Sequence, residues 1–118
     1  MLQSYRDLIV WQKGVDLVVE LYKATKFFPE TERYGLTSQM RRSAVSIPAN
    51  IAEGYTRRHK QEYTQFIRTA FASGAELETH LLIAKRLDFL SESSYDNLEK
   101  SLTEIMKMLY VMIKKVKT

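Results

Sequence analysis

Cysteine is absent from the 118-residue sequence, and glycine and proline are scarce, with only four and two residues. Without cysteine the chain forms no disulfide and no thiolate-bound metal site. Strand-rich domains use many turn residues, so the shortage of glycine and proline favours a helical protein. No apolar run approaches the roughly 20 residues that span a bilayer, and the first residues lack the pattern of a signal peptide. We therefore expect a cytoplasmic protein that does not contact the membrane.

The residues that are present suit one domain, which we expect to cover residues 1–118. Hydrophobic residues make up 45% of the chain, which is enough for a packed core. The net charge of +4 permits a polyanionic partner without requiring one. Between residues 41 and 68, Glu53 and Glu62 are the only acids beside six basic residues: Arg41, Arg42, Arg57, Arg58, Lys60 and Arg68. A second basic group, with no acid, lies near the end of the chain at Lys107, Lys114, Lys115 and Lys117.

Apolar residues recur at intervals of three and four along four segments, which predicts four helices. The first three cover about residues 5–28, 36–55 and 60–87, and the fourth follows a cap at Ser91 or Ser93. Short loops join them, so we predict an all-α, antiparallel up-down-up-down four-helix bundle. The fourth helix carries the clearest seam for packing against its neighbours: Tyr95, Leu98, Leu102, Ile105, Leu109, Met112 and Val116.

The second segment contains the stretch RRSAVSIPANIAEG, residues 41–54, which has a proline inside a helical pattern. Pro48 has no amide hydrogen to donate to the preceding turn, so we expect the helix to bend there. Thr37 or Ser38 is expected to cap the start of this helix, and Gly54 to end it in a left-handed conformation.

Small residues in the second and third helices indicate a close approach between them. The second helix carries Ser43, Ala44, Ser46, Ala49 and Ala52, and the third carries Ala70, Ala72, Ser73, Gly74 and Ala75. Asn50 and Glu53 fall near this contact, and Gln39 or Arg42 is expected to complete a buried polar network with them. The surface has two interpretations: a tight helix crossing with one polar network, or a surface for recognition or assembly.

Several motifs resemble one known family of helical proteins. The main match is the pair Arg41 and Arg42, followed by small residues and the pattern SI-x-x-NIAEG at residues 46–54. Supporting matches are VW at residues 10–11, ERYGLTSQ at 32–39, AELET at 75–79 and LLIA at 81–84. Over about residues 5–115 the chain resembles the 23S rRNA-intervening-sequence (S23) family, which is related to the accessory bundle protein of diversity-generating retroelements.

This resemblance implies a four-helix bundle and a ring-like homopentamer, but it implies little about activity. The family name records that the gene can lie within an insertion in ribosomal RNA genes, which is a gene location and not a binding activity. The related retroelement protein binds nucleic acid and a reverse transcriptase. The chain departs from the family pattern at Ala72, Ser73 and Gly74, where relatives carry Gly-Ser before a larger apolar residue. The contact of the third helix is therefore expected to differ in detail.

Few residues are suited to catalysis or to binding a metal. The only histidines are His59 and His80, and neither belongs to the paired Glu-x-x-His pattern of carboxylate-bridged metal sites in helical bundles. No nucleophile with an oriented base is recognisable, and no glycine-rich phosphate loop is present. We expect no metal, no cofactor and no enzymatic activity. The enzyme alternative would use Glu53, Glu76 and His80.

The basic residues give the main functional hypothesis. Arginine and lysine beside Tyr55 and Tyr63 are able to grip phosphates and stack on unpaired bases, although the same cluster is also typical of a solvated turn. The predicted nucleic-acid-binding residues are Arg41, Arg42, Arg57, Arg58 and Lys60. A homo-oligomer would repeat these groups, so that several weak contacts to RNA or DNA act together.

The first helix is more apolar than a single packing face requires, and Trp11 and Val19 are the residues predicted for a subunit interface. We therefore predict a non-enzymatic homo-oligomer, a pentamer by resemblance, that binds nucleic acid or a ribonucleoprotein. The alternative is a scaffold that binds another protein, and no nucleic acid, through the same apolar residues.

Overall fold

Four α-helices follow one another through residues 4–116, the part of the chain that this computed structural model describes. The helices are α1 (Ile9–Thr25), α2 (Leu36–Tyr55), α3 (Lys60–Arg86) and α4 (Glu92–Val116). Two single-turn 3-10 helices, η1 (Tyr5–Asp7) and η2 (Glu30–Glu32), precede α1 and α2. Lys117, which belongs to the predicted basic tail, lies outside the described residues.

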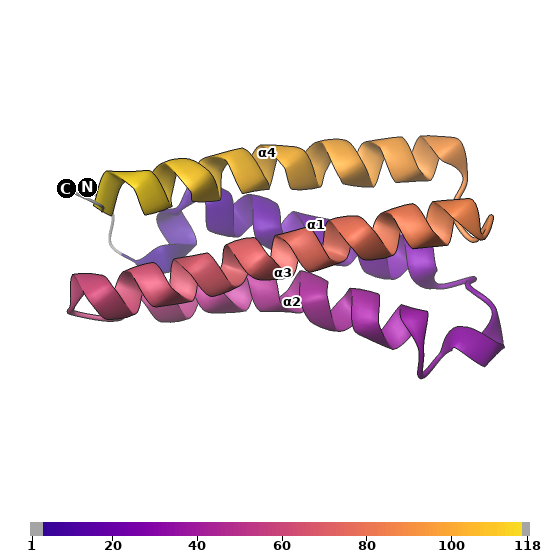
Figure 1. Cartoon of the computed structure of the whole chain (residues 1–118), viewed down its shortest axis with the longest axis horizontal. Helices are drawn as coiled ribbons and strands as arrows, with labels where there is room; N and C mark the ends of the chain where they lie inside the picture. The colour runs from indigo at the N-terminus through magenta and orange to yellow at the C-terminus, as the bar shows by residue number, and fades with distance from the viewer. Residues whose placement is uncertain (1–3, 117–118) are drawn as a thin grey trace.

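Each long helix runs antiparallel to the one before it, and the bundle measures 44 × 24 × 24 Å (Figure 1). α1 and α3 each pack against both α2 and α4. The start of α1, the α2–α3 turn and the end of α4 lie at one end, whereas η2 and the α3–α4 loop lie at the other (Figure 1). The predicted all-α, up-down-up-down four-helix bundle is therefore confirmed. None of the helices in residues 4–116 is long and apolar enough to cross a membrane.

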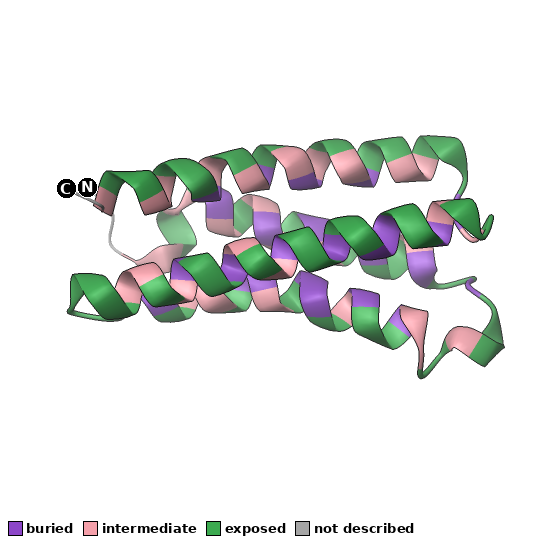
Figure 2. Cartoon of the chain, in the orientation of Figure 1, coloured by how far each residue is buried: buried purple, intermediate pink, exposed green. Residues whose placement is uncertain are grey.

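The core lies between the four helices, which turn their apolar stripes toward one another (Figure 2). The predicted seam of α4 is confirmed at its centre, because Leu98, Leu102, Ile105 and Leu109 are almost completely buried. The largest buried side chains of the other helices are Leu17, Leu21, Met40, Ile47, Ile51, Ile67, Leu77 and Leu81. Burial of each such side chain contributes about 1.5–3 kcal/mol, so this cluster is the main source of stability.

The α-helical part of the first segment is shorter than the predicted residues 5–28. Its first residues form η1 instead, and the extended backbone of Leu8, with φ −73° and ψ 124°, separates η1 from α1. Beyond the end of α1, Phe28 turns inward and packs against Phe89, with ring centroids 5.5 Å apart. The helix thus ends at Thr25, four residues before Pro29.

The predicted capping residues are right for α4 and wrong for α2. At α4, the Ser91 hydroxyl accepts a hydrogen bond from an amide of the first turn at 3.1 Å. At α2, neither Thr37 nor Ser38 caps the helix, because both already lie inside its first turn. The carboxylate of Glu32 instead accepts a hydrogen bond from the Leu36 amide at 3.2 Å. The cap of α2 therefore comes from η2, which fixes this loop against the helix.

α2 continues through Pro48 as one helix, and its two halves meet at a slight angle, as predicted (Figure 1). Pro48 is buried, and a Cβ added to Gly14 of α1 would lie only 3.3 Å from the Pro48 Cβ. The missing side chain of Gly14 thus lets α1 pack directly on the proline. An interior proline costs roughly 3 kcal/mol in an exposed helix, and burial against α1 offsets part of that cost.

Two glycines allow α3 to approach both of its neighbours. Gly54 lies inside α2 without a positive φ, so its predicted left-handed conformation is wrong. A Cβ at this position would lie 3.0 Å from the Cβ of Phe66 and 3.3 Å from the carbonyl oxygen of Tyr63, both in α3. Gly74 of α3 faces Met106 of α4 rather than α2. The small residues of α3 therefore serve two helix contacts and not the single contact predicted.

Replacing Gly54 with alanine is expected to destabilise the protein, even though alanine favours a helix by about 1 kcal/mol. The new methyl group would press against the backbone and Cβ atoms of α3, and overpacking of this kind costs about 1–3 kcal/mol. We expect a lower urea midpoint for Gly54→Ala, measured by circular dichroism, and a larger loss for Gly54→Val.

Gly74→Ala is the matched control for this prediction. Its methyl group would meet the flexible thioether of Met106, which can move aside, so the expected loss is smaller. A Gly54→Ala protein as stable as the natural one would contradict the close packing of α2 on α3.

Candidate nucleic-acid interface

The five basic residues predicted to bind nucleic acid lie at two separate places along α2. Arg41 and Arg42 belong to its first half, whereas Arg57, Arg58 and Lys60 lie in or beside the turn that follows it. The helix between the two groups spans about 20 Å, at a rise of about 1.5 Å per residue. The structure therefore separates the predicted site into two groups of basic residues.

The group at the α2–α3 turn, which we call the turn cluster (Arg57, Arg58 and Lys60), is partly neutralised within the chain. Arg57 pairs with Glu53 at 2.7 Å and lies 3.8 Å from the carboxylate of Glu62. Arg58 and Lys60 are exposed and form no hydrogen bond or ion pair within residues 4–116. Within the turn cluster, these two residues are the ones that a ligand can reach.

A groove of about 620 Å³ lies between the end of α1, the loop after it and the first half of α2. We call it the α1–α2 groove, and its lining residues are Tyr22, Arg33, Tyr34, Thr37, Ser38, Arg41, Arg42, Val45 and Ser46. The lining thus combines three arginines, two tyrosines and three serine or threonine residues, with no acidic side chain. Positive charge beside aromatic rings is a combination that binds phosphates and bases.

Arg41 is anchored within the chain. Its Nε donates to Thr25 Oγ1 at 3.0 Å, and a terminal nitrogen reaches the carbonyl oxygen of Tyr22 at 3.5 Å. The guanidinium carbon also lies 4.4 Å from the ring centroid of Tyr22, which is a cation–π distance. These contacts tie the first half of α2 to the end of α1, so Arg41 shapes the wall of the α1–α2 groove as well as supplying charge.

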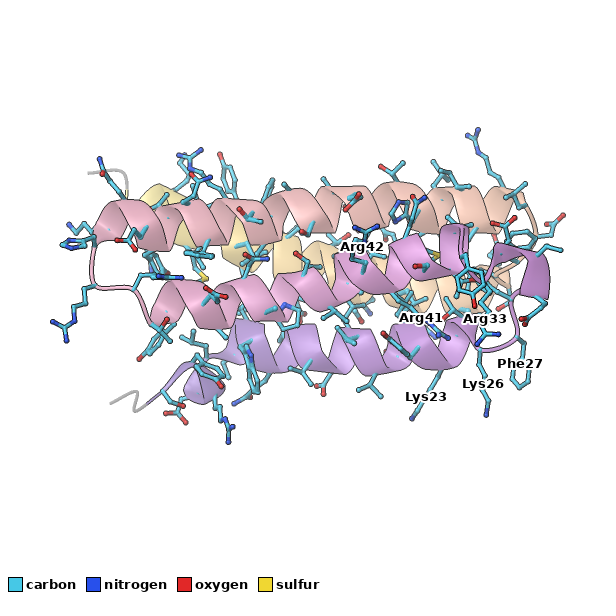
Figure 3. All side chains as sticks on the ribbon, turned by 90° about the horizontal axis from the view of Figure 1, so that it is seen from below. Lys23, Lys26, Phe27, Arg33, Arg41 and Arg42 are labelled. Carbon is cyan, nitrogen blue, oxygen red and sulfur yellow. The ribbon has the colours of Figure 1, made fainter. Side chains whose placement is uncertain are left out.

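Arg33 and Arg42 are more open than Arg41. Arg33 pairs with the exposed carboxylate of Glu30 at 3.3 Å, and its guanidinium carbon lies 5.5 Å from the ring centroid of Tyr34. Arg42 is exposed, lies on the side of α2 that faces α3 (Figure 3), and forms no hydrogen bond or ion pair within the described chain. Water weakens an exposed pair such as Arg33–Glu30, so both guanidinium groups are available to an anion.

Figure 3 shows further basic side chains at the same end of the bundle, and sequence reasoning missed them. Lys23 and Lys26 project outward from the end of α1, and the Lys26 ammonium lies 5.7 Å from the ring centroid of the exposed Phe27. Arg33 was hidden in the sequence because it follows two glutamates in a short loop. In the sequence, this group is indicated by two lysines three residues apart that are followed by a basic loop residue.

Between α2 and α3, the predicted polar network contains Asn50 but neither Gln39 nor Glu53. Ser46 Oγ lies 2.8 Å from Ser73 Oγ of α3, and the Asn50 side chain donates to the carbonyl and hydroxyl oxygens of Ser46, both at 2.8 Å. Glu53 is exposed and pairs with the turn cluster instead. Gln39 is also exposed and forms no hydrogen bond within residues 4–116. The serines therefore take the place of the two longer side chains.

A second polar contact between these helices involves a buried histidine. His80 is only 7% exposed, and its Nδ1 lies 3.4 Å from Ser43 Oγ, which in turn donates to the carbonyl oxygen of Met40 at 3.0 Å. The adjoining pocket, of about 230 Å³, is lined by Gln39, Arg42, Ser43, Ser46, Ser73 and Glu76. Within residues 4–116, no group of three or more histidine, aspartate or glutamate residues is arranged to hold a metal ion.

The two residues predicted for a subunit interface differ in exposure. Val19 is 49% exposed on the outer side of α1. Trp11 is half-buried and packs edge-on against Tyr5, with ring centroids 5.3 Å apart, so part of its ring is used within the chain. Other exposed large apolar residues include Ile9, Phe27, Val45, Leu82, Ile83, Leu87, Tyr110 and Val111.

The model of one protein family, described as 23S rRNA-intervening sequence protein, matches residues 6–111. The chain belongs to this family. Its structure is similar to the crystal structure of a protein of unknown function from the S23 ribosomal protein family of Bacteroides thetaiotaomicron, with a TM-score of 0.82 and 26% identity. That similarity covers 90% of this chain and 99% of the other. No curated protein matches the chain, so these similarities give the family and the fold without an activity.

In this member of the family, the motif that carries the resemblance has mainly a packing role. Ile47 and Ile51 are completely buried in the core, Asn50 bonds within the serine network, and Gly54 lies against α3. The pair of arginines before the motif is different, because it reaches the α1–α2 groove. Arg42, which forms no bond within the described chain, is therefore the member of this pair that is open to a ligand.

We expect the stability of the protein to fall below pH 6.5 through His80. Burial lowers the pKa of His80 from its ordinary value of 6.5, and the carboxylate of Glu76 partly opposes this shift. The folded protein thus binds this proton more weakly than the unfolded chain, so stability is complete above pH 6.5 and is lost as the pH falls toward the lower folded pKa. Urea unfolding at about pH 7 and about pH 5 measures this loss, and His80→Gln should reduce it.

The exposed histidine of the α2–α3 turn provides the control. His59→Gln is expected to leave the difference between the two pH values unchanged, because His59 is open to solvent. An equal reduction in both variants would contradict the assignment to His80.

Proposed function

We propose that this protein is a non-enzymatic, homo-oligomeric helical bundle that binds nucleic acid, RNA or DNA, alone or within a ribonucleoprotein. The observation that carries the proposal is the α1–α2 groove, where three arginines and two tyrosines share one surface with no acidic side chain. Arginine offers a planar fork of donors that fits phosphate oxygens, and an aromatic face stacks on a base of any sequence. The groove thus offers binding groups for the phosphates and for the bases, which every nucleic acid contains.

Charge elsewhere on the molecule supports the same proposal. Lys23 and Lys26 extend the positive surface beyond the α1–α2 groove (Figure 3), and Arg58 and Lys60 are exposed at the other end. The expected relation of the family to the retroelement accessory protein, which binds nucleic acid, points in the same direction. The net charge of +4 is modest, so one subunit is expected to bind weakly and with strong salt dependence.

The buried histidine supports a function without catalysis. A serine nucleophile needs a base within hydrogen-bond reach and an open path for the substrate. Ser43 and His80 lie 3.4 Å apart, but Ser43 is only 2% exposed and already donates to a carbonyl oxygen. Burial of both side chains and the existing bond of the Ser43 hydroxyl therefore make this pair poorly suited to attack a substrate.

Homo-oligomerisation would raise the overall affinity for a nucleic-acid strand above that of a single subunit. Each subunit would present one α1–α2 groove, and several grooves on one strand act together as multivalent contacts. The support for self-association is the exposed apolar surface, which includes Val19 on α1 and Leu82, Ile83 and Leu87 on α3 and the loop after it. Apolar surface of this kind is commonly covered by another protein surface.

A protein scaffold is the second candidate function, and one apolar groove favours it. This groove, of about 440 Å³, lies between the start of α1 and the end of α4. Its lining residues are Asp7, Leu8, Ile9, Val10, Met108, Val111 and Met112. Methionine-rich apolar grooves adapt to helices of different sequence. The scaffold would capture its partner without any contribution from the arginines of the α1–α2 groove.

The protein is expected to bind a fluorescein-labelled single-stranded RNA of about 20 nucleotides, and DNA of the same sequence, at low salt. With about three phosphate contacts per groove, the affinity should fall about tenfold or more between about 50 mM and about 200 mM salt. Fluorescence anisotropy measures both constants. Absence of binding at the lower salt concentration, or binding that ignores salt, would reject the proposal and leave the scaffold as the better interpretation.

Charge reversal at matched arginines tests which surface binds. Arg42→Glu should weaken binding more than Arg58→Glu, because both residues are exposed but only Arg42 lines the α1–α2 groove. Equal losses would show that total charge, rather than the groove, holds the strand.

Light scattering of the purified protein is expected to give a mass of about 69 kDa, which is five times the 13.8 kDa of one chain. Val19→Glu should lower this mass, because a buried charge at a subunit interface is costly. A mass of one chain at high protein concentration would refute the oligomer.

A further inference from the structure

Resting on the proposed function, we infer that the α1–α2 groove holds one unpaired nucleotide, with its phosphate at the N-terminus of α2 and its base against Tyr34. Five features of the groove support this inference: the uncapped amides of α2, a buried hydroxyl without a partner, the arginines, one open aromatic face and the volume.

The N-terminus of α2 opens at the α1–α2 groove with amides still available. Glu32 takes the Leu36 amide, but the amides of Thr37 and Ser38 have no hydrogen-bond acceptor within residues 4–116. Helix N-termini with free amides attract anions through these donors and through the helix dipole. A phosphate group supplies the oxygen acceptors that both amides lack.

A buried hydroxyl at the same place points independently to a ligand. Thr37 lines the α1–α2 groove and is only 8% exposed, and its Oγ1 is buried with no hydrogen-bond partner in the described chain. Leaving such a group unpaired in the interior of a protein is costly. No other buried side-chain oxygen or nitrogen within residues 4–116 lacks a partner. A rotation of the Thr37 side chain about its Cα–Cβ bond would bring the hydroxyl to the groove, where a phosphate oxygen accepts its hydrogen bond and removes this cost.

The arginines favour an anion over a neutral ligand at this position. Arg33, Arg41 and Arg42 all line the α1–α2 groove, and Arg41 is held in place by its bonds to Thr25 and Tyr22. Glu32 bonds to the start of α2 and Glu30 pairs with Arg33, so three arginines stand beside two carboxylates and the local charge stays positive. A phosphate group carrying one or two negative charges balances this excess.

Tyr34 distinguishes an unpaired nucleotide from a bare phosphate and from a duplex. Its side chain is 87% exposed, and the guanidinium of Arg33 lies over the ring at 5.5 Å from the centroid. A base can stack on the remaining exposed surface of the ring. In a duplex the base faces are covered by neighbouring bases, so only an unpaired base reaches the ring. The groove volume of about 620 Å³ lies within the range of about 300–1,000 Å³ for small-ligand sites.

The test uses ¹⁵N-labelled protein and adenosine 5′-monophosphate, with adenosine and inorganic phosphate as separate probes. We expect the nucleotide to shift the amide resonances of Thr37 and Ser38, inorganic phosphate to shift them with lower affinity, and adenosine to leave them nearly unchanged. In Tyr34→Leu, affinity for the nucleotide should fall at least about fivefold, the lower bound for stacking on one base, whereas affinity for inorganic phosphate should stay the same.

Tyr110→Leu is the matched control, because Tyr110 is an exposed tyrosine on α4, away from the groove. Amide spectra of both variants show whether each still folds. Nucleotide affinity that is unchanged in Tyr34→Leu, or reduced equally in both variants, would overturn the inference. Shifts confined to residues outside the α1–α2 groove would overturn it as well.

The labelled RNA separates failure of the inference from failure of the proposed function. Salt-dependent binding of the RNA without nucleotide shifts at Thr37 and Ser38 would overturn the inference alone. Equal affinity for the single strand and for a duplex of the same sequence would do the same. Nucleotide binding in the groove without any RNA or DNA binding would overturn the nucleic-acid function and leave a free nucleotide as the ligand.

Discussion

The contact between α2 and α3 depends on glycine and serine residues, whose small side chains let the two helices come close together. Gly54 lets the backbone of α3 come close, and Ser46 and Ser73 join the two helices by a hydrogen bond of 2.8 Å. Close approach strengthens dispersion along the whole interface, because each atom gains partners at contact distance. This contact also fixes the position of α2, which carries Arg41 and Arg42 and leads directly into the turn cluster. The candidate binding groups therefore lie where packing of the second helix places them.

Helical periodicity predicted the fold well, because the apolar stripes are long and regular. The bounds predicted for α2 and α3 differ from the structure by one residue at most. The start of α1 was predicted less well, since the extended backbone at Leu8 leaves no trace in the spacing of apolar residues. The roles of Gly54 and of the α2 cap were wrong for a related reason. Each depends on a neighbour, Phe66 or Glu32, that is brought close only by the folded chain.

The candidate site was predicted only in part, because residues of one basic stretch in the sequence end up at different places in the folded bundle. Arg42 and Arg58 belong to one basic stretch of the sequence, but the second half of α2 holds them far apart. Arg33 was missed although it lines the same groove as Arg42, because it comes from a loop rich in glutamate. The unpartnered hydroxyl of Thr37 has no signal in the sequence at all, since its burial results from tertiary packing.

The positions of the start of α1 and the end of α4 have a practical consequence for tagging and immobilising the protein. α1 begins and α4 ends at the end of the bundle that is opposite the α1–α2 groove (Figure 1). An affinity tag, a fluorescent domain or a surface linker fused before α1 or after α4 would therefore emerge on the far side. Immobilising the protein through either fusion point would leave the arginine-lined surface facing the solution.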